Sequence, residues 1–498
     1  MIQRIVNGRE RGRVGMAMRK AMREGKLKEA IRIAEQWRSA GGRDWQITLN
    51  LGVCLSREAD KRDSDAIALA KEALSVSRGH PAALMGSAEI ANNIGHFEWC
   101  LDLLEKAEVC CTTNSQWEII RLKTAALSRL GRQQTAEQTL ENWPESRRDW
   151  RWLLAKGDAL IQNNQWEEAE DCYRDVLRQQ PGNPVANQNL ALALLSQKKW
   201  DEGWKQYEWR RSNPRQNKKG PLSCLSGSWE QARKGTVVVI GEQGIGDQIM
   251  TARYLPELAN ECNHLIFQPA PRLMELMARS LPETIEIRHP QDPIVTTNGE
   301  IVVIGTGSLP FLYWKKQGFC TPCQQGYLIA DPSRVDWWKH RLLDLSSGRP
   351  CVGVGWLGGS NGADHRERSL SREDIRKLTS NEKIFWVDLQ YLPKSWQQKR
   401  ANSAPGCRNV MGDPGQDLDD TAALIKALDG VITTRQTVAH FAGALGIPGA
   451  VLVPARREWR YSQNKNRWEW YRSIIICQQG ERGAWSAAIE EALQMLTL

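Results

Sequence analysis

Apolar and polar positions in the first part of the chain recur with the period of amphipathic helices, and one short pattern is repeated along it. The pattern is a small or polar turn, an aromatic or apolar residue, an acidic or polar pair, and a small residue that opens a helix. Its six copies follow one another at intervals of about 34 residues, the period of helix-turn-helix solenoids. The small residues at the matching position are Ala30, Ala66, Cys100, Ala136, Ala169 and Gly203.

The fifth copy is the clearest, because Trp166 and Ala169 are followed by Tyr173 and Pro181. The small residue lets two helices approach closely, the aromatic residue one turn later fills the space between them, and the proline ends the second helix. This pattern resembles the tetratricopeptide repeat over roughly residues 10–213, and the other copies are degenerate. The resemblance implies a superhelix in which these residues pack, and a concave surface that binds a peptide or protein.

From Gly235 onward the pattern changes to short apolar runs separated by helical segments. Such alternation is typical of parallel sheets built from β-α-β units. The runs form a group of three and a group of four on either side of a polar, tryptophan-containing stretch around residues 331–350. We therefore expect two Rossmann-like sheets that face each other across a cleft, with ligands beyond the carboxyl ends of the strands. The runs are residues 236–241, 264–268, 300–305, 351–356, 383–390, 430–434 and 449–454.

The loop after the first of these runs is rich in glycine and carries a carboxylate. A dinucleotide fingerprint would need glycine where the chain has Ile249, and a P-loop would need lysine after Gly246, where the chain has Asp247. Both motifs are therefore excluded. The loop, which includes Gly244, is instead expected to deliver Asp247 to the start of a helix facing the cleft. Capping of that helix is an alternative explanation of the aspartate.

Longer stretches, in consistent order, look like the bacterial tetratricopeptide-linked glycosyltransferases, which are relatives of the heptosyltransferases of glycosyltransferase family 9. The resemblance covers about residues 198–478. It implies a GT-B fold and an inverting, metal-independent transferase that uses a nucleotide-activated sugar. The matching stretches are KKWDEGWKQYEWRR (198–211), GSW (227–229), GEQGIGDQIMTARYLPELA (241–259), GVGWLGG…RERSL (353–370), WVDLQ (386–390), DLDDTAALIKALDGVITT (417–434), TVAHFAGALGIP (437–448) and EWRY…WYRS (458–473).

Together, the repeats and this resemblance predict an α plus α/β chain of three domains. Residues 1–215 are expected to form the helical solenoid. Residues 216–335 are expected to form the first Rossmann-like domain, which lies on the acceptor side and carries the base. Residues 336–498 are expected to form the second Rossmann-like domain, which binds the nucleotide-sugar donor.

The resemblance also implies roles for particular residues. In the heptosyltransferases the aspartate of the first loop is the general base, and the matching residue here is Asp247. An inverting transfer needs such a carboxylate to take the proton of the acceptor hydroxyl. Candidates for binding the donor diphosphate are Arg366, Arg368 and Ser369, because guanidinium groups bind phosphate oxygens in a bidentate manner. A solvated charged loop is the alternative for these three residues.

Further donor-binding candidates lie later in the chain. A helix that opens near Thr437 and His440 would direct free backbone N–H groups at the same phosphates, although a structural cap explains His440 equally well. Gln390, at the carboxyl end of its strand, is a candidate for recognising the nucleotide base or ribose. Aromatic residues that would wall this pocket, with core packing as the equal alternative, are Trp459 and Tyr461, or Trp470 and Tyr471.

One position departs from the family. Relatives commonly carry aspartate five residues before the histidine, whereas this chain has Arg435. A cation at this position would bind phosphate in place of an acid that contacts the sugar or ribose. The same change is also consistent with a different donor or with lost activity.

Composition and charge narrow the function classes. A net charge of +9 over 498 residues fits anionic ligands but is too diffuse to predict nucleic-acid binding. No run reaches the ~20 apolar residues of a transmembrane helix, and the basic N-terminus lacks the apolar segment of a secretory signal. The twelve cysteines are scattered, as in a reduced chain, and Cys320 and Cys323 lack a second pair for zinc. We expect a cytoplasmic protein with no metal or other cofactor.

These observations favour a glycosyltransferase of the hexosyl or heptosyl type, whose repeats dock a glycan or protein acceptor. The alternative is a catalytically inactive scaffold that uses the same repeats and sheets for protein–protein interaction. Asp247, Arg368 and Ser369 favour the enzyme, while Arg435 and the degenerate repeats favour the scaffold. The sequence does not name the sugar, the nucleotide, the acceptor or the oligomeric state.

Overall fold

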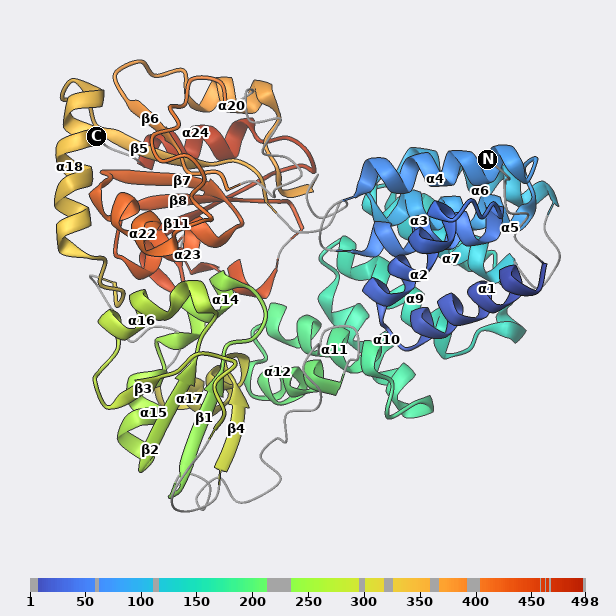
Figure 1. Ribbon diagram of the computed structural model, residues 1–498, viewed down its shortest axis with the longest axis horizontal. Coiled ribbons are helices and arrows are strands. Elements are labelled where there is room, and N and C mark those ends of the chain that lie inside the picture. The colour runs from blue at the N-terminus through green and yellow to red at the C-terminus, as the bar shows by residue number, and fades with distance from the viewer. Residues whose placement is uncertain are drawn as a thin grey trace. The chain divides into compact units, whose positions relative to one another are not determined.

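The computed structural model describes residues 8–58, 62–110, 116–212, 234–294, 301–317, 326–358, 367–391, 404–456, 458–461, 463–464 and 467–495. Its contacts divide the chain into two units (Figure 1). The first holds the helices up to Ala193, and the second begins at Leu194 and contains both sheets.

The first unit is built from helices that pack in sequential pairs, such as α3 with α4 and α9 with α10. No strand occurs among the described residues between 8 and 212, so the prediction of an all-helical repeat region is confirmed there. The helices are α1 (Gly8–Arg23), α2 (Leu27–Ser39), α3 (Trp45–Arg57), α4 (Asp63–Val76), α5 (Pro81–Asn93), α6 (Phe97–Cys110), α7 (Gln116–Arg129), α8 (Gln133–Glu141), α9 (Trp150–Gln162), α10 (Trp166–Gln179) and α11 (Pro184–Ser196).

The small residues at the repeated position are buried in every copy. The five with side chains, Ala30, Ala66, Cys100, Ala136 and Ala169, have no exposed surface. They stand near the start of the second helix of each pair, where a larger side chain would push the two helices apart. The sixth, Gly203, is buried in α12 (Trp200–Tyr207).

Gly203 provides a test of this packing. A Cβ atom at this position would lie 2.8 Å from Cδ2 of Leu195 and 3.1 Å from its backbone nitrogen. We expect Gly203→Val to lower the free energy of unfolding by about 2 kcal/mol, because the extra carbons overpack the contact. Chemical denaturation of the full chain measures this change. Gly12→Val is the control, since Gly12 also lies in a helix but has nothing within 4 Å of its Cβ position; equal losses in both variants would contradict the packing argument.

The first sheet of the second unit has four parallel strands in the order β3-β2-β1-β4. Three of them were predicted as apolar runs. The additional strand, β3, has only three residues, of which one is buried, and is too short to show a pattern. The elements are β1 (Thr236–Ile240), α14 (Ile245–Ala252), α15 (Leu255–Glu261), β2 (His264–Gln268), α16 (Met274–Ser280), β3 (Ile285–Ile287), β4 (Ile301–Gly305) and α17 (Leu309–Gln317).

The second sheet has seven strands in the order β6-β5-β7-β8-β11-β10-β9. The pairs from β6 to β11 are parallel, as predicted, and β11, β10 and β9 pair antiparallel. The last three strands were not expected. The elements are α18 (Pro332–Ser346), β5 (Cys351–Gly355), α20 (Arg372–Leu378), β6 (Phe385–Asp388), α22 (Leu418–Ala427), β7 (Gly430–Thr434), α23 (Thr437–Ala444), β8 (Gly449–Val453), β9 (Gln463–Asn464), β10 (Arg467–Trp468), β11 (Tyr471–Gln478) and α24 (Ser486–Met495).

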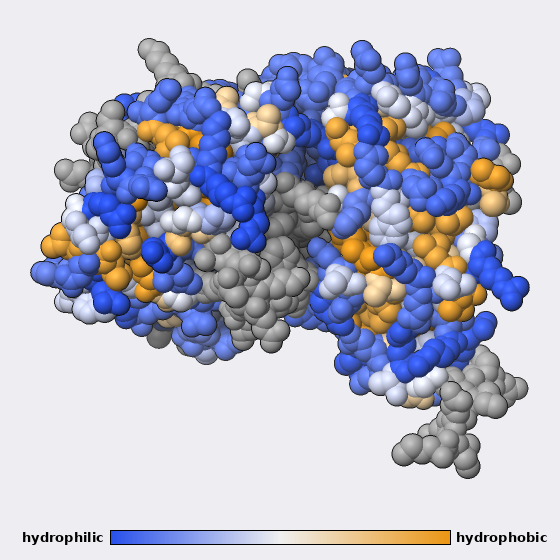
Figure 2. Space-filling view, turned by 90° about the horizontal axis from the view of Figure 1, so that it is seen from above, coloured by the Kyte–Doolittle hydropathy of each residue, from blue (hydrophilic) through white to orange (hydrophobic). Residues whose placement is uncertain are grey.

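Burial follows the usual distribution for such sheets. Strands β5, β7 and β8 are buried at every position, because helices and neighbouring strands cover them on all sides. Hydrophilic residues cover most of the face seen in Figure 2, and hydrophobic residues appear there in small patches.

The last copy of the repeat groups with the sheets. Helix α12 and the following 3-10 helix η3 (Glu208–Ser212) belong to the second unit, and α12 packs against α17. The Arg210 side chain, which is 3% exposed, donates hydrogen bonds to Glu208, Glu242 and Ser308. Burial works against its charge, but Glu208 and Glu242 outweigh burial and raise the pKa of Arg210 above its usual range. This buried network fixes η3, which directly follows α12, to the loops after β1 and β4.

Candidate functional site

Asp247 lies at the start of α14, at the carboxyl end of β1, as predicted. The helix begins after Gly244, and Asp247 occupies its third position. Its Oδ2 accepts a hydrogen bond of 3.2 Å from the Gly244 backbone N–H. The carboxylate therefore caps the helix with one oxygen, the arrangement in which an acid at the third position satisfies an otherwise free N–H. The second oxygen is available for another partner.

Arg460 is that partner. It lies in the 3-10 helix η7 (Trp459–Tyr461) after β8, and its Nε donates a hydrogen bond of 2.7 Å to Oδ1 of Asp247. The remaining nitrogens of the guanidinium donate to Glu458 Oε1 at 3.0 Å, to the Tyr207 hydroxyl at 3.2 Å and to Gln243 Oε1 at 3.1 Å. Arg460 thus joins the aspartate in the loop after β1 of the first sheet to the segment that follows β8 of the second sheet.

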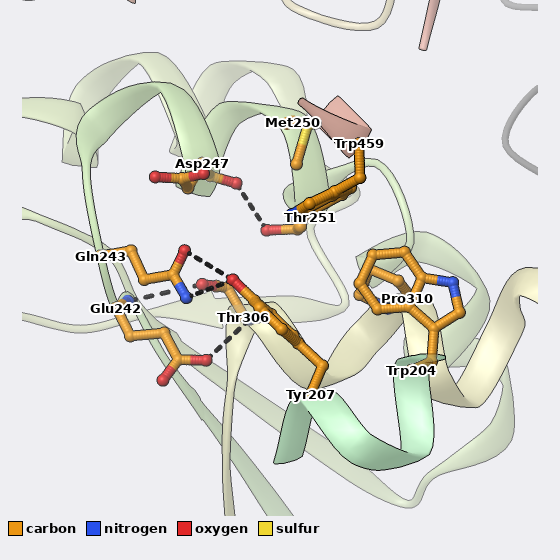
Figure 3. A pocket seen from close by; sticks show the side chains of 11 residues that line it. Trp204, Tyr207, Glu242, Gln243, Asp247, Met250, Thr251, Thr306, Pro310 and Trp459 are labelled. Atoms are coloured by element: carbon orange, nitrogen blue, oxygen red, sulfur yellow. Dashed lines mark hydrogen bonds between the residues drawn. The ribbon is translucent and has the colours of Figure 1, made fainter. Parts of the chain in front are cut away.

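Tyr207 and Gln243 complete this cluster. The Gln243 amide donates a hydrogen bond of 2.7 Å to the Tyr207 hydroxyl, and Figure 3 shows the two groups pointing toward each other beside Asp247. Gln243 has a backbone φ of 62°, a left-handed conformation that costs a non-glycine residue of the order of 1–3 kcal/mol. Such strain is typical of functional loops. Burial raises the pKa of Tyr207, so the hydroxyl keeps its proton at neutral pH.

A small pocket opens beside Asp247. The space inside it is about that of one water molecule. Aromatic rings form one part of its wall and polar groups of the first sheet domain form another (Figure 3). A space of this size admits a water molecule or a single hydroxyl group. The lining residues are Trp204, Tyr207, Glu242, Gln243, Asp247, Met250, Thr251, Thr306, Gly307, Pro310 and Trp459.

His440 lies against the glycine loop and is buried. A Cβ atom at Gly246 would lie 2.6 Å from Cδ2 of the imidazole, so only glycine at 246 allows α14 and α23 to approach this closely. Nδ1 lies 3.3 Å from the Tyr471 hydroxyl, and the ring packs on Trp468 with a centroid distance of 5.1 Å. Burial lowers the pKa of His440 from 6.5 to about 4. In the folded chain the side chain is neutral at pH 7.

This burial predicts a pH dependence of stability. The unfolded chain binds a proton at His440 near pH 6.5, whereas the folded chain does so only near pH 4. Stability is therefore lost as pH falls through this window, by about 3 kcal/mol for this residue. We expect the free energy of unfolding, measured by urea denaturation, to fall more between about pH 7.5 and about pH 4.5 for wild type than for His440→Gln. Parallel curves for the two proteins would mean that His440 does not carry this effect.

Two of the predicted phosphate-binding residues, Arg368 and Arg435, lie near the same carboxylate, that of Glu458. Ser369 Oγ accepts a hydrogen bond of 3.2 Å from the Gly358 backbone N–H, and Arg368 NH2 lies 3.7 Å from Glu458 Oε2. Arg435 NH1 is 2.8 Å from the same Glu458 oxygen. Arg366 lies outside the described residues.

Gln390 has a different set of partners from the one expected of a nucleotide-binding residue. Its Oε1 accepts hydrogen bonds from the backbone N–H groups of Trp356 at 3.0 Å and Leu357 at 2.7 Å, and its Nε2 donates to the Tyr391 carbonyl. The amide therefore holds the loop that follows β5. Thr437 begins α23, where Gln436 is the N-cap without a side-chain cap. The roles of Gln390 and Thr437 toward a donor stay predictions.

The aromatic candidates take part in core packing. Trp459 is 2% exposed and lies edge-to-face against Trp204 and Tyr207, with centroid distances of 5.1 and 5.7 Å. Its ring also lies 4.4 Å from the Arg460 guanidinium carbon, a cation–π contact that holds the arginine in place. Tyr461 stacks on Trp468, and Trp470 and Tyr471 are buried. The contacts of these rings are therefore those of core packing, which the sequence left open as the alternative to a pocket wall.

Four residues of the cluster were not singled out from the sequence: Tyr207, Gln243, Glu458 and Arg460. The signal available was weak, since Glu458 and Arg460 stand in the EWRY stretch whose aromatic residues alone were considered.

Among the residues that the structure describes, no group of three or more His, Cys, Asp or Glu side chains is placed to hold a metal ion. Cys320 and Cys323 lie outside that part. No described helix is both long and apolar enough to span a bilayer.

A curated relative matches part of the chain. FlbA of Caulobacter vibrioides is 27% identical over 346 residues, which cover 63% of this chain and 56% of FlbA. The chain thus spans little more than half the length of that relative.

Several solved structures also match, at low similarity. A family 9 glycosyltransferase from Veillonella parvula is 10% identical, covers 50% of this chain and 87% of its own, and has a TM-score of 0.36. The O-GlcNAc transferase of Thermobaculum terrenum is 11% identical, covers 91% of this chain and 90% of its own, and has a TM-score of 0.27. These TM-scores are too low to establish a shared fold.

The helical region has a clearer assignment. The tetratricopeptide repeat family model matches residues 133–184 and 154–208. A tetratricopeptide repeat protein from Parabacteroides merdae is 15% identical, covers 41% of this chain and 80% of its own, and has a TM-score of 0.32. The family match, the buried small residues and the paired helices agree with one another. The chain therefore contains tetratricopeptide repeats, followed by two sheets made largely of parallel strands.

Proposed function

We propose that the chain is an inverting glycosyltransferase with a GT-B arrangement of its two sheet domains, which moves a sugar from a nucleotide-activated donor to a glycan or protein acceptor. The observation that carries the proposal is the position of Asp247. Its carboxylate stands at the carboxyl end of β1, lines a pocket, and faces an arginine-rich segment that follows β8 of the other sheet. A base beside cations is the arrangement that transfer from a diphosphate requires.

The base role is supported by the chemistry of the pocket. The acceptor hydroxyl would enter between the aromatic wall and Asp247, whose Oδ1 would take its proton once Arg460 turns toward the donor. Glu458, Tyr207 and Gln243 hold the other nitrogens of Arg460, so the phosphate oxygens of the donor would have to replace these hydrogen bonds for the turn to occur. The neutral His440 next to Gly246 adds no competing charge to the loop.

The donor role of the second sheet domain is supported by its cations. Arg368, Arg435 and Arg460 lie within reach of one another around Glu458. They would stabilise the negative charge of the leaving nucleoside diphosphate, and the first turn of α23 would add backbone N–H groups. The chain would then use arginines and helix dipoles where other transferases use a metal ion. The repeats would bind the acceptor or a partner protein, as tetratricopeptide superhelices do.

A panel of nucleotides and nucleotide-sugars tests this proposal. A ligand that binds the folded state must raise the melting temperature of the full chain. We expect one nucleotide family to raise it in a concentration-dependent manner, and Arg435→Gln to weaken that effect. The proposal is contradicted if no member of a panel covering the common nucleoside diphosphate-sugars changes the melting temperature.

The rival function is a scaffold without catalytic activity. One observation favours it: both oxygens of Asp247 already have partners, Gly244 and Arg460, and the carboxylate is thus used structurally. A scaffold would bind a protein through its repeats and would not release nucleoside diphosphate from any donor. Measured turnover of a donor separates the two functions.

A further inference from the structure

Three arginines lie within ion-pair distance of a single glutamate beside the second sheet, and a fourth, Arg456, adds to the positive charge there. Glu458 Oε2 lies 2.8 Å from Arg435 NH1 and 3.7 Å from Arg368 NH2, and its Oε1 accepts a hydrogen bond of 3.0 Å from Arg460 NH1. Burial would raise the pKa of Glu458, but Arg435, Arg368, Arg460 and Arg456 hold it well below its usual range. The site therefore contains an anion that is part of the chain.

Arg435 is the most deeply buried of these arginines, with 1% of its side chain exposed. Its contact with Glu458 is short enough for an ion pair, but the groups are not aligned as a hydrogen bond. Within the described part of the chain, Nε, NH1 and NH2 of Arg435 donate no hydrogen bond, and Oε2 of Glu458 accepts none. Buried donors that stay unsatisfied are costly. Glu458 balances the charge of Arg435 without satisfying its donors.

A phosphate group would satisfy them better. The planar guanidinium group can donate two parallel hydrogen bonds to two oxygens of a phosphate. The Glu458 carboxylate lies close to Arg435 but is not in the position to accept such bonds. Burial lowers the pKa of Arg435 to about 10, with Glu458 acting in the opposite sense. The side chain therefore remains a cation at neutral pH, and because only 1% of it is exposed, an anion would reach it by displacing Glu458.

We infer that Glu458 occupies the place of a ligand phosphate among these arginines and sets the specificity of the site for diphosphates over monophosphates. The inference rests on the proposed donor site. A single phosphate would have to replace a carboxylate that the arginines already bind, so the net binding free energy of a monophosphate would be small. A diphosphate carries a second anionic group and could engage Arg435 and Arg368 together, which offsets the loss of Glu458.

Calorimetric titration of the full chain with inorganic phosphate and inorganic pyrophosphate tests this inference. In wild type we expect pyrophosphate to bind at least about 100-fold more tightly than phosphate. Glu458→Gln keeps the shape of the side chain and removes its charge, so phosphate affinity should rise by about 10- to 100-fold. The preference for pyrophosphate should narrow accordingly.

Glu490→Gln is the matched control. Glu490 is an exposed glutamate on α24 that pairs with Lys377, and its substitution changes the net charge of the chain equally but should leave both affinities unchanged. Weaker binding of both anions to Glu458→Gln, or an unchanged preference, would overturn the inference. If Glu458→Gln does not fold, the wild-type ratio decides, and a pyrophosphate preference below about tenfold overturns it.

Sugar transfer is measured in a separate experiment. The proposed transferase activity and the proposed role of Glu458 can therefore be contradicted independently. A narrowed anion preference in Glu458→Gln, together with no transfer from any nucleotide-sugar, would remove the proposed function and leave the anion site. Transfer by wild type, with an unchanged anion preference in Glu458→Gln, would leave the transferase and remove this role of Glu458.

Discussion

Asp247→Asn is expected to lower turnover by roughly 10²–10⁴, the usual contribution of a general base. The substitution keeps nearly the same volume and can still accept the hydrogen bond from Gly244, but it cannot take the proton of the acceptor hydroxyl. Donor affinity should change little, because the cations that would hold the diphosphate lie in the second sheet domain. Steady-state release of nucleoside diphosphate, measured with separate determination of donor affinity, distinguishes the two effects.

Asp374→Asn controls for the capping function. Asp374 stands at the third position of α20 and accepts a hydrogen bond of 2.9 Å from the backbone N–H of Ser371, which is the same arrangement that Asp247 has with Gly244. This variant should keep wild-type turnover. If Asp247→Asn also kept it while remaining folded, Asp247 would be a helix cap alone and the base assignment would be wrong.

Arg210→Met is expected to lower the free energy of unfolding by about 4 kcal/mol, the effect of removing one partner from a buried ion pair. The guanidinium is 3% exposed, and its loss removes the buried cation that pairs with Glu208 and Glu242. The Ser308 hydroxyl loses a donor as well. Chemical denaturation of the full chain measures the change.

Arg334→Met is the matched control for this prediction. Arg334 forms an ion pair of 2.8 Å with Asp417, but both side chains are at least 38% exposed, so the loss should stay below about 1 kcal/mol. Similar losses in both variants would mean that the Arg210 network contributes no more than a surface pair. A large loss for Arg210→Met alone would show that the network fixes η3, and with it the end of α12, to the first sheet.

The elements with a strong local pattern were predictable from the sequence. The repeat places a small residue at one position in each copy, and the buried strands β5, β7 and β8 read as continuous apolar runs. Strand β11 was missed because its buried positions are interrupted by Arg472 and Ser473. Strands β9 and β10 have two residues each and carry no readable pattern.

The candidate site shows the same division. The position of Asp247 at the start of α14 was predictable because its loop is local, while its role as a base is implied by the resemblance alone and stays a prediction. Arg460, its partner, is 213 residues away, and nothing in a single sequence pairs two residues at that separation. The position of Gln390 at the carboxyl end of β6 was predicted from the sequence. Its hydrogen bonds to the loop after β5 were not, because they depend on which strand lies next to β6.

The central claim is that a nucleotide-sugar binds with its diphosphate at the arginines around Glu458 and its sugar toward Asp247. A crystal structure of the full chain with the nucleotide-sugar identified by the melting panel tests it most directly. The account predicts diphosphate oxygens within hydrogen-bond distance of Arg435 and Arg368, with Arg460 turned from Asp247 toward the donor. A nucleotide bound elsewhere, with the Arg460–Asp247 and Arg435–Glu458 pairs intact, would contradict it.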